Sequence, residues 1–83
     1  MIITVWSVTH NLHPSGKLET LVFPTEQAAW ICWVQLVGVA WNSWFGHDSK
    51  LYPGGDAAAL ILEAIPECPY RVQKTAHLVH INV

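Results

Sequence analysis

The residues between Glu26 and Asp48 constrain the fold more than any other part of the chain. Twenty-one consecutive residues there carry no charge, and they include four of the five tryptophans. A helix of this length that is apolar on most sides has more surface to bury than so small a domain can cover. We therefore expect part of it to be buried against another molecule: a second copy of the chain, a partner protein or a membrane.

The composition predicts one folded domain over residues 1–83. Hydrophobic residues make up 52% of the chain and charged residues 12%, which is far from a disordered composition. The chain has only four basic residues and a net charge of −2, which is too little positive charge for binding nucleic acid through its phosphates. The N-terminal residues lack a basic region and a small-residue cleavage site, so we expect no secretory signal. Cys32 and Cys68 are expected to be buried thiols in a reducing cytoplasm, with a disulfide between them as the alternative.

Three segments have the composition of β-strands. Residues 2–9 and 18–23 are rich in β-branched and aromatic side chains, and the loop between them carries Asn, Pro, Ser and Gly, which predicts an antiparallel hairpin. Residues 71–82 predict a third strand. Its apolar positions change parity near Leu78 and Val79, which indicates either a bulge or a strand end buried on both faces.

Two segments between the second and third strands are predicted to be helices. The first covers residues 26–45, with Thr25 as N-cap and Gly46 as C-cap. The second is shorter, with Asp56 as its cap and Pro66 at its end. The order ββααβ predicts an α+β domain with a three-stranded antiparallel sheet in the order 2-1-3 and both helices packed on one face.

The surface of the long helix divides into stripes when residues are placed at 100° intervals. Small residues form one stripe, which we expect to lie on the sheet: Ala28, Ala29, Cys32, Leu36, Val39, Ala40 and Ser43. A second stripe is expected to face sideways or outward, partly as core and partly as the interface of an isologous homodimer: Trp30, Trp33, Val37, Trp41 and Trp44. Two alternatives for this second stripe are the domain's own core and a membrane span.

The sequence contains no catalytic motif, so we expect a protein without enzymatic activity and without a cofactor. The histidine pairs His10/His13 and His77/His80 are the only close ones. Residues three apart on a strand point to opposite faces, so the second pair cannot easily bind one ion. A site pooled from His10, His13 and His80 is the metal alternative, but the Cys/His spacing of a zinc site is missing, and we predict no metal.

The segment LVFPTEQAAW after a β-hairpin, followed by the terminal strand HLVHINV, is similar to small phage and prophage accessory proteins. The residues that carry the likeness are Thr25, Glu26, Ala28 and Ala29. The ββααβ layout also resembles some anti-CRISPR proteins, which block bacterial defence complexes by binding them. The resemblance implies a phage-type inhibitor in the cytoplasm of a bacterial host.

The expected mode of action is stoichiometric binding to a protein partner, with loops and scattered acids as the contact surface. The predicted partner-binding residues are Asn11, His13, Lys17, His47, Asp48, Lys50, Tyr52, Glu63 and Glu67. A histidine-dependent metal or small-ligand module is the alternative function, and a membrane-associated small protein is the third.

Overall fold

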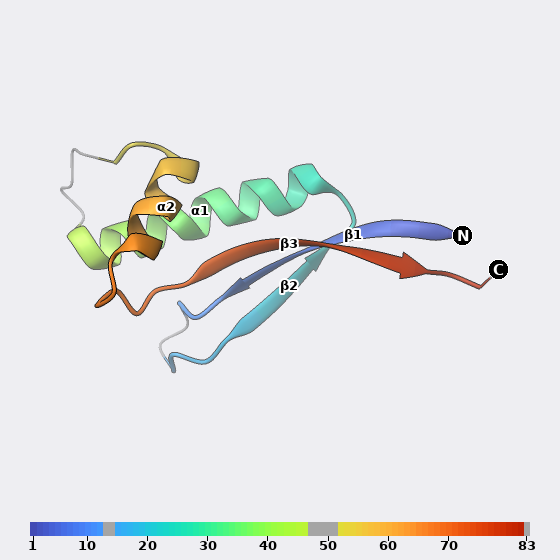
Figure 1. Ribbon diagram of the computed structural model, residues 1–83, viewed down its shortest axis with the longest axis horizontal. Helices are drawn as coiled ribbons and strands as arrows, with labels where there is room; N and C mark the ends of the chain where they lie inside the picture. The colour runs from blue at the N-terminus through green and yellow to red at the C-terminus, as the bar shows by residue number, and fades with distance from the viewer. Residues whose placement is uncertain (13–14, 47–51, 83) are drawn as a thin grey trace.

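The computed structural model describes residues 1–12, 15–46 and 52–82, and it has the predicted ββααβ order (Figure 1). The strands are β1 (Ile2–His10), β2 (Glu19–Phe23) and β3 (Val72–His80), and the helices are α1 (Glu26–Phe45) and α2 (Gly55–Ala64). The α+β prediction and the ββααβ layout are confirmed.

The sheet has the order β2-β1-β3, with both pairings antiparallel. β3 pairs with β1 along its whole length, from Ile2 opposite His80 to His10 opposite Val72. β2 pairs only with the second half of β1, from Trp6 opposite Phe23 to His10 opposite Glu19. The predicted strand order is therefore correct, and over residues 2–5 β1 pairs with β3 alone among the strands that the structure describes.

The ends of α1 are set by the local signals that the sequence shows. The Thr25 side chain accepts a hydrogen bond from the Ala28 N–H at 3.2 Å, which satisfies one free donor of the first turn. Gly46 has a φ of 94°, and its N–H donates to the Asn42 carbonyl at 2.8 Å. Because a positive φ costs glycine nothing, the chain can leave the helix there.

The buried face of α1 combines parts of the two predicted stripes. One row of the helix is buried against the other elements: Ala29, Trp33, Val37, Ala40 and Trp41. This row takes two members from the small-residue stripe and three from the tryptophan stripe, while Val39 of the small stripe is 50% exposed. The expectation that the small stripe is buried is wrong for Val39, whereas a tryptophan stripe that is partly core agrees with the expectation. Parts of both stripes are buried because α1 contacts both the sheet and α2.

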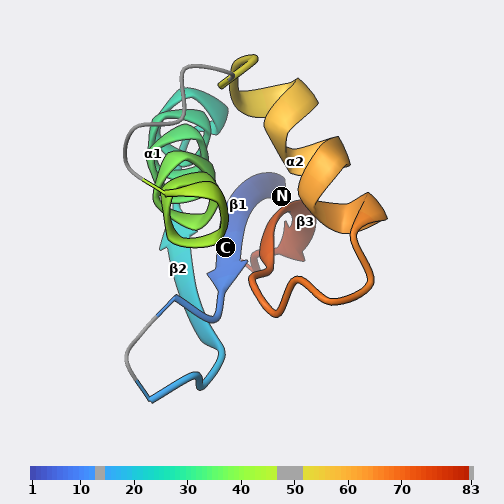
Figure 2. The same cartoon turned by 90° about the vertical axis from the view of Figure 1, so that its left-hand side faces the viewer.

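Helix α2 packs against α1, and Figure 2 shows the two helices side by side. The N-cap of α2 is Gly54, with a φ of 107° and no side-chain cap, so the prediction of Asp56 as the cap is wrong. Asp56 lies in the first turn, where the helix dipole stabilises its carboxylate. A Cβ on Gly55 would lie 3.3 Å from Val34 Cγ2 and 3.4 Å from Trp33 Cζ3, so a glycine lets the helices approach closely.

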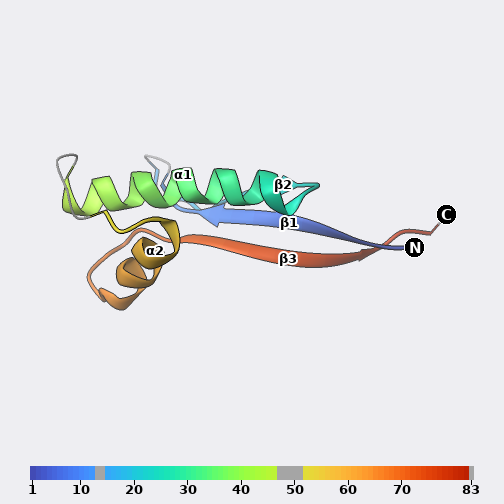
Figure 3. The same ribbon diagram turned by 90° about the horizontal axis from the view of Figure 1, so that it is seen from above.

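The parity change in β3 has a different cause from the two that the sequence suggested. The register between β1 and β3 is unbroken from Val72 to His80, so there is no bulge in the strand. The strand end is also not buried, because Leu78 is 73% and Val79 37% exposed on opposite faces. The first residues of β1 (2–5) pair with the last residues of β3 (77–80) as a two-stranded ribbon, which extends beyond α1 (Figures 1 and 3).

The protein is elongated, with extents of 51 × 26 × 19 Å. The helices lie at one end and the ribbon at the other (Figure 3). Within residues 1–12, 15–46 and 52–82, no helix combines the length and the apolar character needed to cross a membrane.

Both cysteines are free thiols, as predicted, and Cys68 is buried while Cys32 is half-buried. Burial raises the pKa of the Cys32 thiol, because the thiolate loses solvation there.

We expect Cys32 to react with iodoacetamide more slowly than free cysteine at pH 8, and its rate to keep rising at higher pH. Mass spectrometry of the labelled protein measures this rate, and a Cys32→Ser variant gives the background from Cys68. A rate equal to that of free cysteine would contradict the burial of Cys32.

Two tryptophans of α1 give a matched test of its orientation. Trp33 is 7% exposed and Trp44 is 36% exposed. Trp33→Ala leaves a cavity between α1, α2 and β3, and we expect it to lower the free energy of unfolding by about 3–5 kcal/mol. Trp44→Ala is expected to cost less than about 1 kcal/mol. Urea denaturation followed by circular dichroism measures both; equal losses would show that the helix is rotated from the orientation described.

Candidate partner-binding groove

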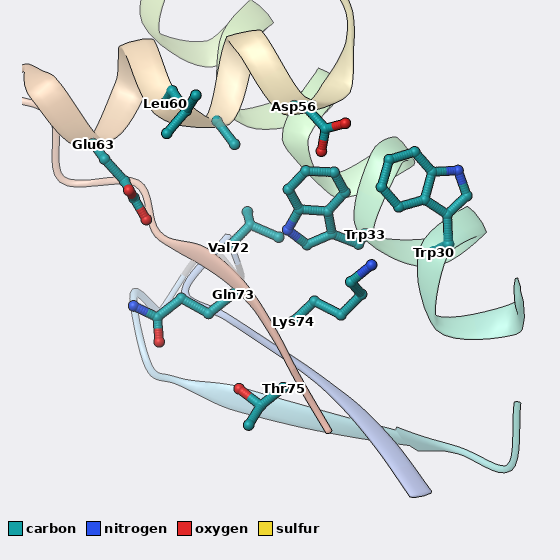
Figure 4. A pocket seen from close by; sticks show the side chains of 10 residues that line it. Trp30, Trp33, Asp56, Leu60, Glu63, Val72, Gln73, Lys74 and Thr75 are labelled. Carbon is teal, nitrogen blue, oxygen red and sulfur yellow. The ribbon is translucent and has the colours of Figure 1, made fainter. Parts of the chain in front are cut away.

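A groove opens between α1, α2 and β3, and its volume is about 590 Å³ (Figure 4). Three elements that follow one another along the chain form its walls. Ten residues line the groove: Trp30 and Trp33 from α1, Asp56, Ala59, Leu60 and Glu63 from α2, and Val72, Gln73, Lys74 and Thr75 from β3. Its size is within the range of ligand-binding clefts.

An aromatic and cationic cluster forms one end of the groove. The rings of Trp30 and Trp33 lie 5.2 Å apart and are tilted by 32°. The Lys74 ammonium lies 4.6 Å from the centre of the Trp30 ring and 5.6 Å from that of Trp33. Both distances are within the range of a cation–π contact. Within the described part of the chain, this ammonium has aromatic faces but no carboxylate as a close partner, so its charge is available to a ligand.

The opposite wall of the groove is one face of α2. Asp56, Leu60 and Glu63 are four and then three residues apart, which places them on the same side of the helix. Figure 4 shows Asp56 near the Trp33 ring and Glu63 at the other end, with Leu60 between them. Leu60 is 67% exposed. The wall is therefore apolar in its middle and acidic at both ends.

The backbone of β3 gives the groove a free sheet edge. The Asn11 N–H donates to the Arg71 carbonyl at 3.3 Å, and the Ile81 N–H donates to the Met1 carbonyl at 2.7 Å. Antiparallel pairs alternate, so the odd-numbered residues of β3 form the hydrogen bonds to β1. The N–H and C=O groups of Val72 and Lys74 consequently point away from β1. β3 is the last strand of the sheet that the described residues form, so these groups have no strand partner there.

Two polar pairs lie outside the groove. The Ser7 hydroxyl lies 2.7 Å from His77 Nε2 on the side of the sheet away from α1, as a nucleophile and a base do in a hydrolytic triad. No carboxylate among the described residues is paired with His77, and the two residues do not line the groove. His10 accepts the Leu12 N–H at Nδ1, so its proton is on Nε2, which lies 3.6 Å from Glu19. Sequence inspection missed the Ser7–His77 contact, which depends on strand register.

The alternative metal site of His10, His13 and His80 is wrong for His10 and His80, the two of these histidines that the structure describes. His10 pairs with Val72, whereas His80 pairs with Ile2 at the other end of β1. Eight residues of strand separate these positions, which is about 26 Å. Among the described residues no group of three or more His, Cys, Asp or Glu side chains can hold a metal ion. His13 lies outside the described residues.

The predicted partner-binding residues are placed in different surroundings. Glu63 lies in the groove wall. Glu67 and Lys17 are exposed, and Tyr52 is 41% exposed with its ring edge-on to Trp41 at 5.7 Å. His13, His47, Asp48 and Lys50 lie outside the described residues. The structure thus brings Glu63 into the groove and leaves the other described residues outside it.

Asn11 has a structural connection that the sequence did not reveal. Its side-chain amide donates to the Pro69 carbonyl at 2.6 Å, and its Oδ1 accepts the Arg71 N–H at 2.8 Å. The Arg71 guanidinium in turn donates to the Cys68 carbonyl at 2.7 Å. Asn11 therefore joins the end of β1 to the turn between α2 and β3, which fixes the groove wall relative to its sheet edge.

The predicted dimer stripe is divided between the core and the groove. Trp33, Val37 and Trp41 are core residues of the single chain, with exposures of 7%, 1% and 4%. Trp30 and Trp44 are the members with substantial exposure, at 38% and 36%, and Trp30 lines the groove. The sequence did not indicate that Lys74, Leu60 and Asp56 line the same groove as Trp30. The helical spacing of Asp56, Leu60 and Glu63 is the one sequence signal that places some of these residues on a common face.

No family model, no curated protein and no solved structure matches the chain.

The Asn11 connection can be tested with two substitutions of the same side chain. Asn11→Ala removes both hydrogen bonds, and we expect it to lower the free energy of unfolding by about 1–3 kcal/mol. Asn11→Asp keeps the acceptor for the Arg71 N–H and loses the donor to Pro69, so a smaller loss is expected. Thermal denaturation measures both variants. If Asn11→Ala is as stable as the native protein, the connection contributes nothing to the fold.

Proposed function

We propose that the chain is a non-catalytic protein-binding module whose groove holds an extended segment of a partner protein. The observation that carries this proposal is the free edge of β3, where the N–H and C=O groups of Val72 and Lys74 border an apolar groove. An extended peptide that adds to a sheet edge obtains its affinity from main-chain hydrogen bonds and its specificity from pockets for alternate side chains.

The residues that line the groove determine which side chains of such a segment fit it. Every second residue of a strand paired with β3 points to the same side as Val72 and Lys74, towards the tryptophans and Leu60. An apolar or aromatic side chain fits there, because Trp30 and Leu60 are exposed around the site. The Glu63 end of the wall favours a basic side chain, and the Lys74 ammonium favours an acidic one.

The layout resemblance supplies the concrete candidate for the partner. The ββααβ order is shared with some anti-CRISPR proteins, and on this basis the partner is a bacterial CRISPR–Cas complex. The module then acts as a phage-type inhibitor in the cytoplasm of the host. It occupies a surface of the complex stoichiometrically and performs no chemistry.

A capture experiment with a groove variant tests both parts of the proposal. Tagged protein is incubated with lysates of bacteria that carry different CRISPR–Cas systems, and the retained proteins are identified by mass spectrometry. Leu60→Glu places a charge in the apolar middle of the groove, and we expect it to reduce the retained complex at least tenfold. Ile61→Glu is the matched control, because Ile61 is 40% exposed on the same helix but does not line the groove.

The possible outcomes separate the binding site from the partner. Loss of the complex with Leu60→Glu and retention with Ile61→Glu would support the groove. Equal retention of a complex by both variants would show that another surface binds it. If native protein retains no defence complex from any lysate, the inhibitor assignment is wrong.

A further inference from the structure

The free end of the β1–β3 ribbon has an unpaired backbone edge of its own. Pairing with β2 stops at Trp6, so residues 2–5 of β1 have only β3 beside them. The odd-numbered residues of β1 bond to β3, as the Met1–Ile81 and Asn11–Arg71 pairs show. The N–H and C=O groups of Ile2 and Thr4 therefore point outward, on the side that β2 occupies further along. No described strand pairs with them.

Both faces of this ribbon carry exposed apolar side chains. Ile2 is 58% and Leu78 73% exposed on the face that α1 covers further along, and Val79 and Ile81 are each 37% exposed on the other. Residues 1–10 and 75–82 contain no Asp, Glu, Lys, Arg or Pro. Proteins that keep a strand edge free of partners usually protect it with lysine, proline or a bulge. This edge has none of these, and its register is regular.

The surface of the single chain is larger than its size requires. A compact protein of 9.3 kDa exposes about 5000 Å², whereas this chain exposes 5735 Å². Its radius of gyration is 14.4 Å, compared with about 12 Å for a compact domain of this length. The surplus of roughly 700 Å² shows that an elongated single chain leaves more surface uncovered than a compact one would. The ribbon at the end away from the helices accounts for the elongated shape (Figure 3).

We propose that a second copy of the chain pairs with this edge, antiparallel and about a two-fold axis, so that the two sheets become one continuous sheet. In the register that uses both outward-pointing residues, Ile2 of each copy lies opposite Thr4 of the other. Ile3 then lies opposite Ile3 of the second copy on the axis. Each Ile2–Thr4 pair exchanges both of its backbone hydrogen bonds.

A second copy fits this edge because the edge is complementary to itself. An antiparallel pairing of identical strands places each outward N–H opposite an outward C=O of the other copy, and the two-fold axis closes the assembly at two chains. The segment carries no acidic or basic side chain that would repel its symmetry mate. The exposed side chain of Ile2 is covered on one side by Thr4 of the second copy, which lies opposite it in this register. This interface differs from the tryptophan stripe, whose central members are core residues.

Two proline substitutions on opposite edges of the ribbon test the proposal. Thr4→Pro removes an outward N–H at the proposed interface, and Ala76→Pro removes an outward N–H on the other edge of the same ribbon. Proline is tolerated at such edge positions because no bond within the sheet is lost. We expect the native protein and Ala76→Pro to dimerise with similar dissociation constants in sedimentation equilibrium. For Thr4→Pro we expect a dimer dissociation constant that is higher by about 30-fold or more. Circular dichroism verifies that both variants keep the native fold.

A cysteine on the proposed axis tests the register without disturbing the backbone. Ile3 of the two copies forms a non-hydrogen-bonded pair, in which side chains come closest, so Ile3→Cys should give a disulfide-linked dimer under mild oxidation. Val5→Cys lies on the same face but opposite Met1 of the second copy, and it should not form a disulfide above the level of the native protein. Trp44→Ala should stay dimeric.

The outcomes decide between the ribbon and other arrangements. A native protein that stays monomeric at millimolar concentration would overturn the proposal, as would a Thr4→Pro variant that dimerises like the native protein. Loss of the dimer in Trp44→Ala alone would place the interface on the helix. None of these results depends on whether the groove binds a partner.

Discussion

The burial of Trp33 is the interaction on which the arrangement of the helices and the groove depends. Its ring lies beside Trp30, under the Lys74 ammonium and against the first turn of α2, where Gly55 leaves room for it. A single large aromatic side chain thus connects α1, α2 and β3. Since a three-stranded sheet cannot cover a 20-residue apolar helix, α2 is needed to bury a second side of α1. The groove is the space that remains where α2 does not reach β3.

The elements and their order could be predicted because their signals are local. Thr25 and Gly46 mark the ends of α1 through hydrogen bonds and a φ that depend on nearby residues. The rotation of α1 could not be predicted in this way. A helix that is apolar on nearly every side has no clear polar face, so its periodicity does not show which row is buried. Trp33 and Trp44 look equivalent in the sequence, and tertiary packing makes one a core residue and the other half-exposed.

The groove and the ribbon depend on contacts between distant residues. Lys74 in a strand resembles an ordinary solvated lysine until β3 lies beside α1, which places its ammonium over two tryptophans. In β3 the change of parity at Leu78 and Val79 showed correctly that both faces are apolar. It could not distinguish an end that is buried on both faces from one that is exposed on both. The distinction depends on where α1 begins: it follows directly on β2, which ends opposite Trp6, and the ribbon extends beyond the helix (Figure 3).

The two proposed surfaces use different edges and different ends of the same sheet. The groove uses the outer edge of β3 at Val72 and Lys74, next to the helices. The ribbon uses the edge of β1 at Ile2 and Thr4, at the far end of the molecule (Figure 1). Pairing at one edge therefore does not block the other, and a dimer joined at the ribbons carries two grooves. A partner complex with repeated subunits can then be held at two points, and the second contact is strengthened by the high effective concentration that the first creates. Two grooves on one assembly would raise the overall affinity for such a partner without any new contact at either groove.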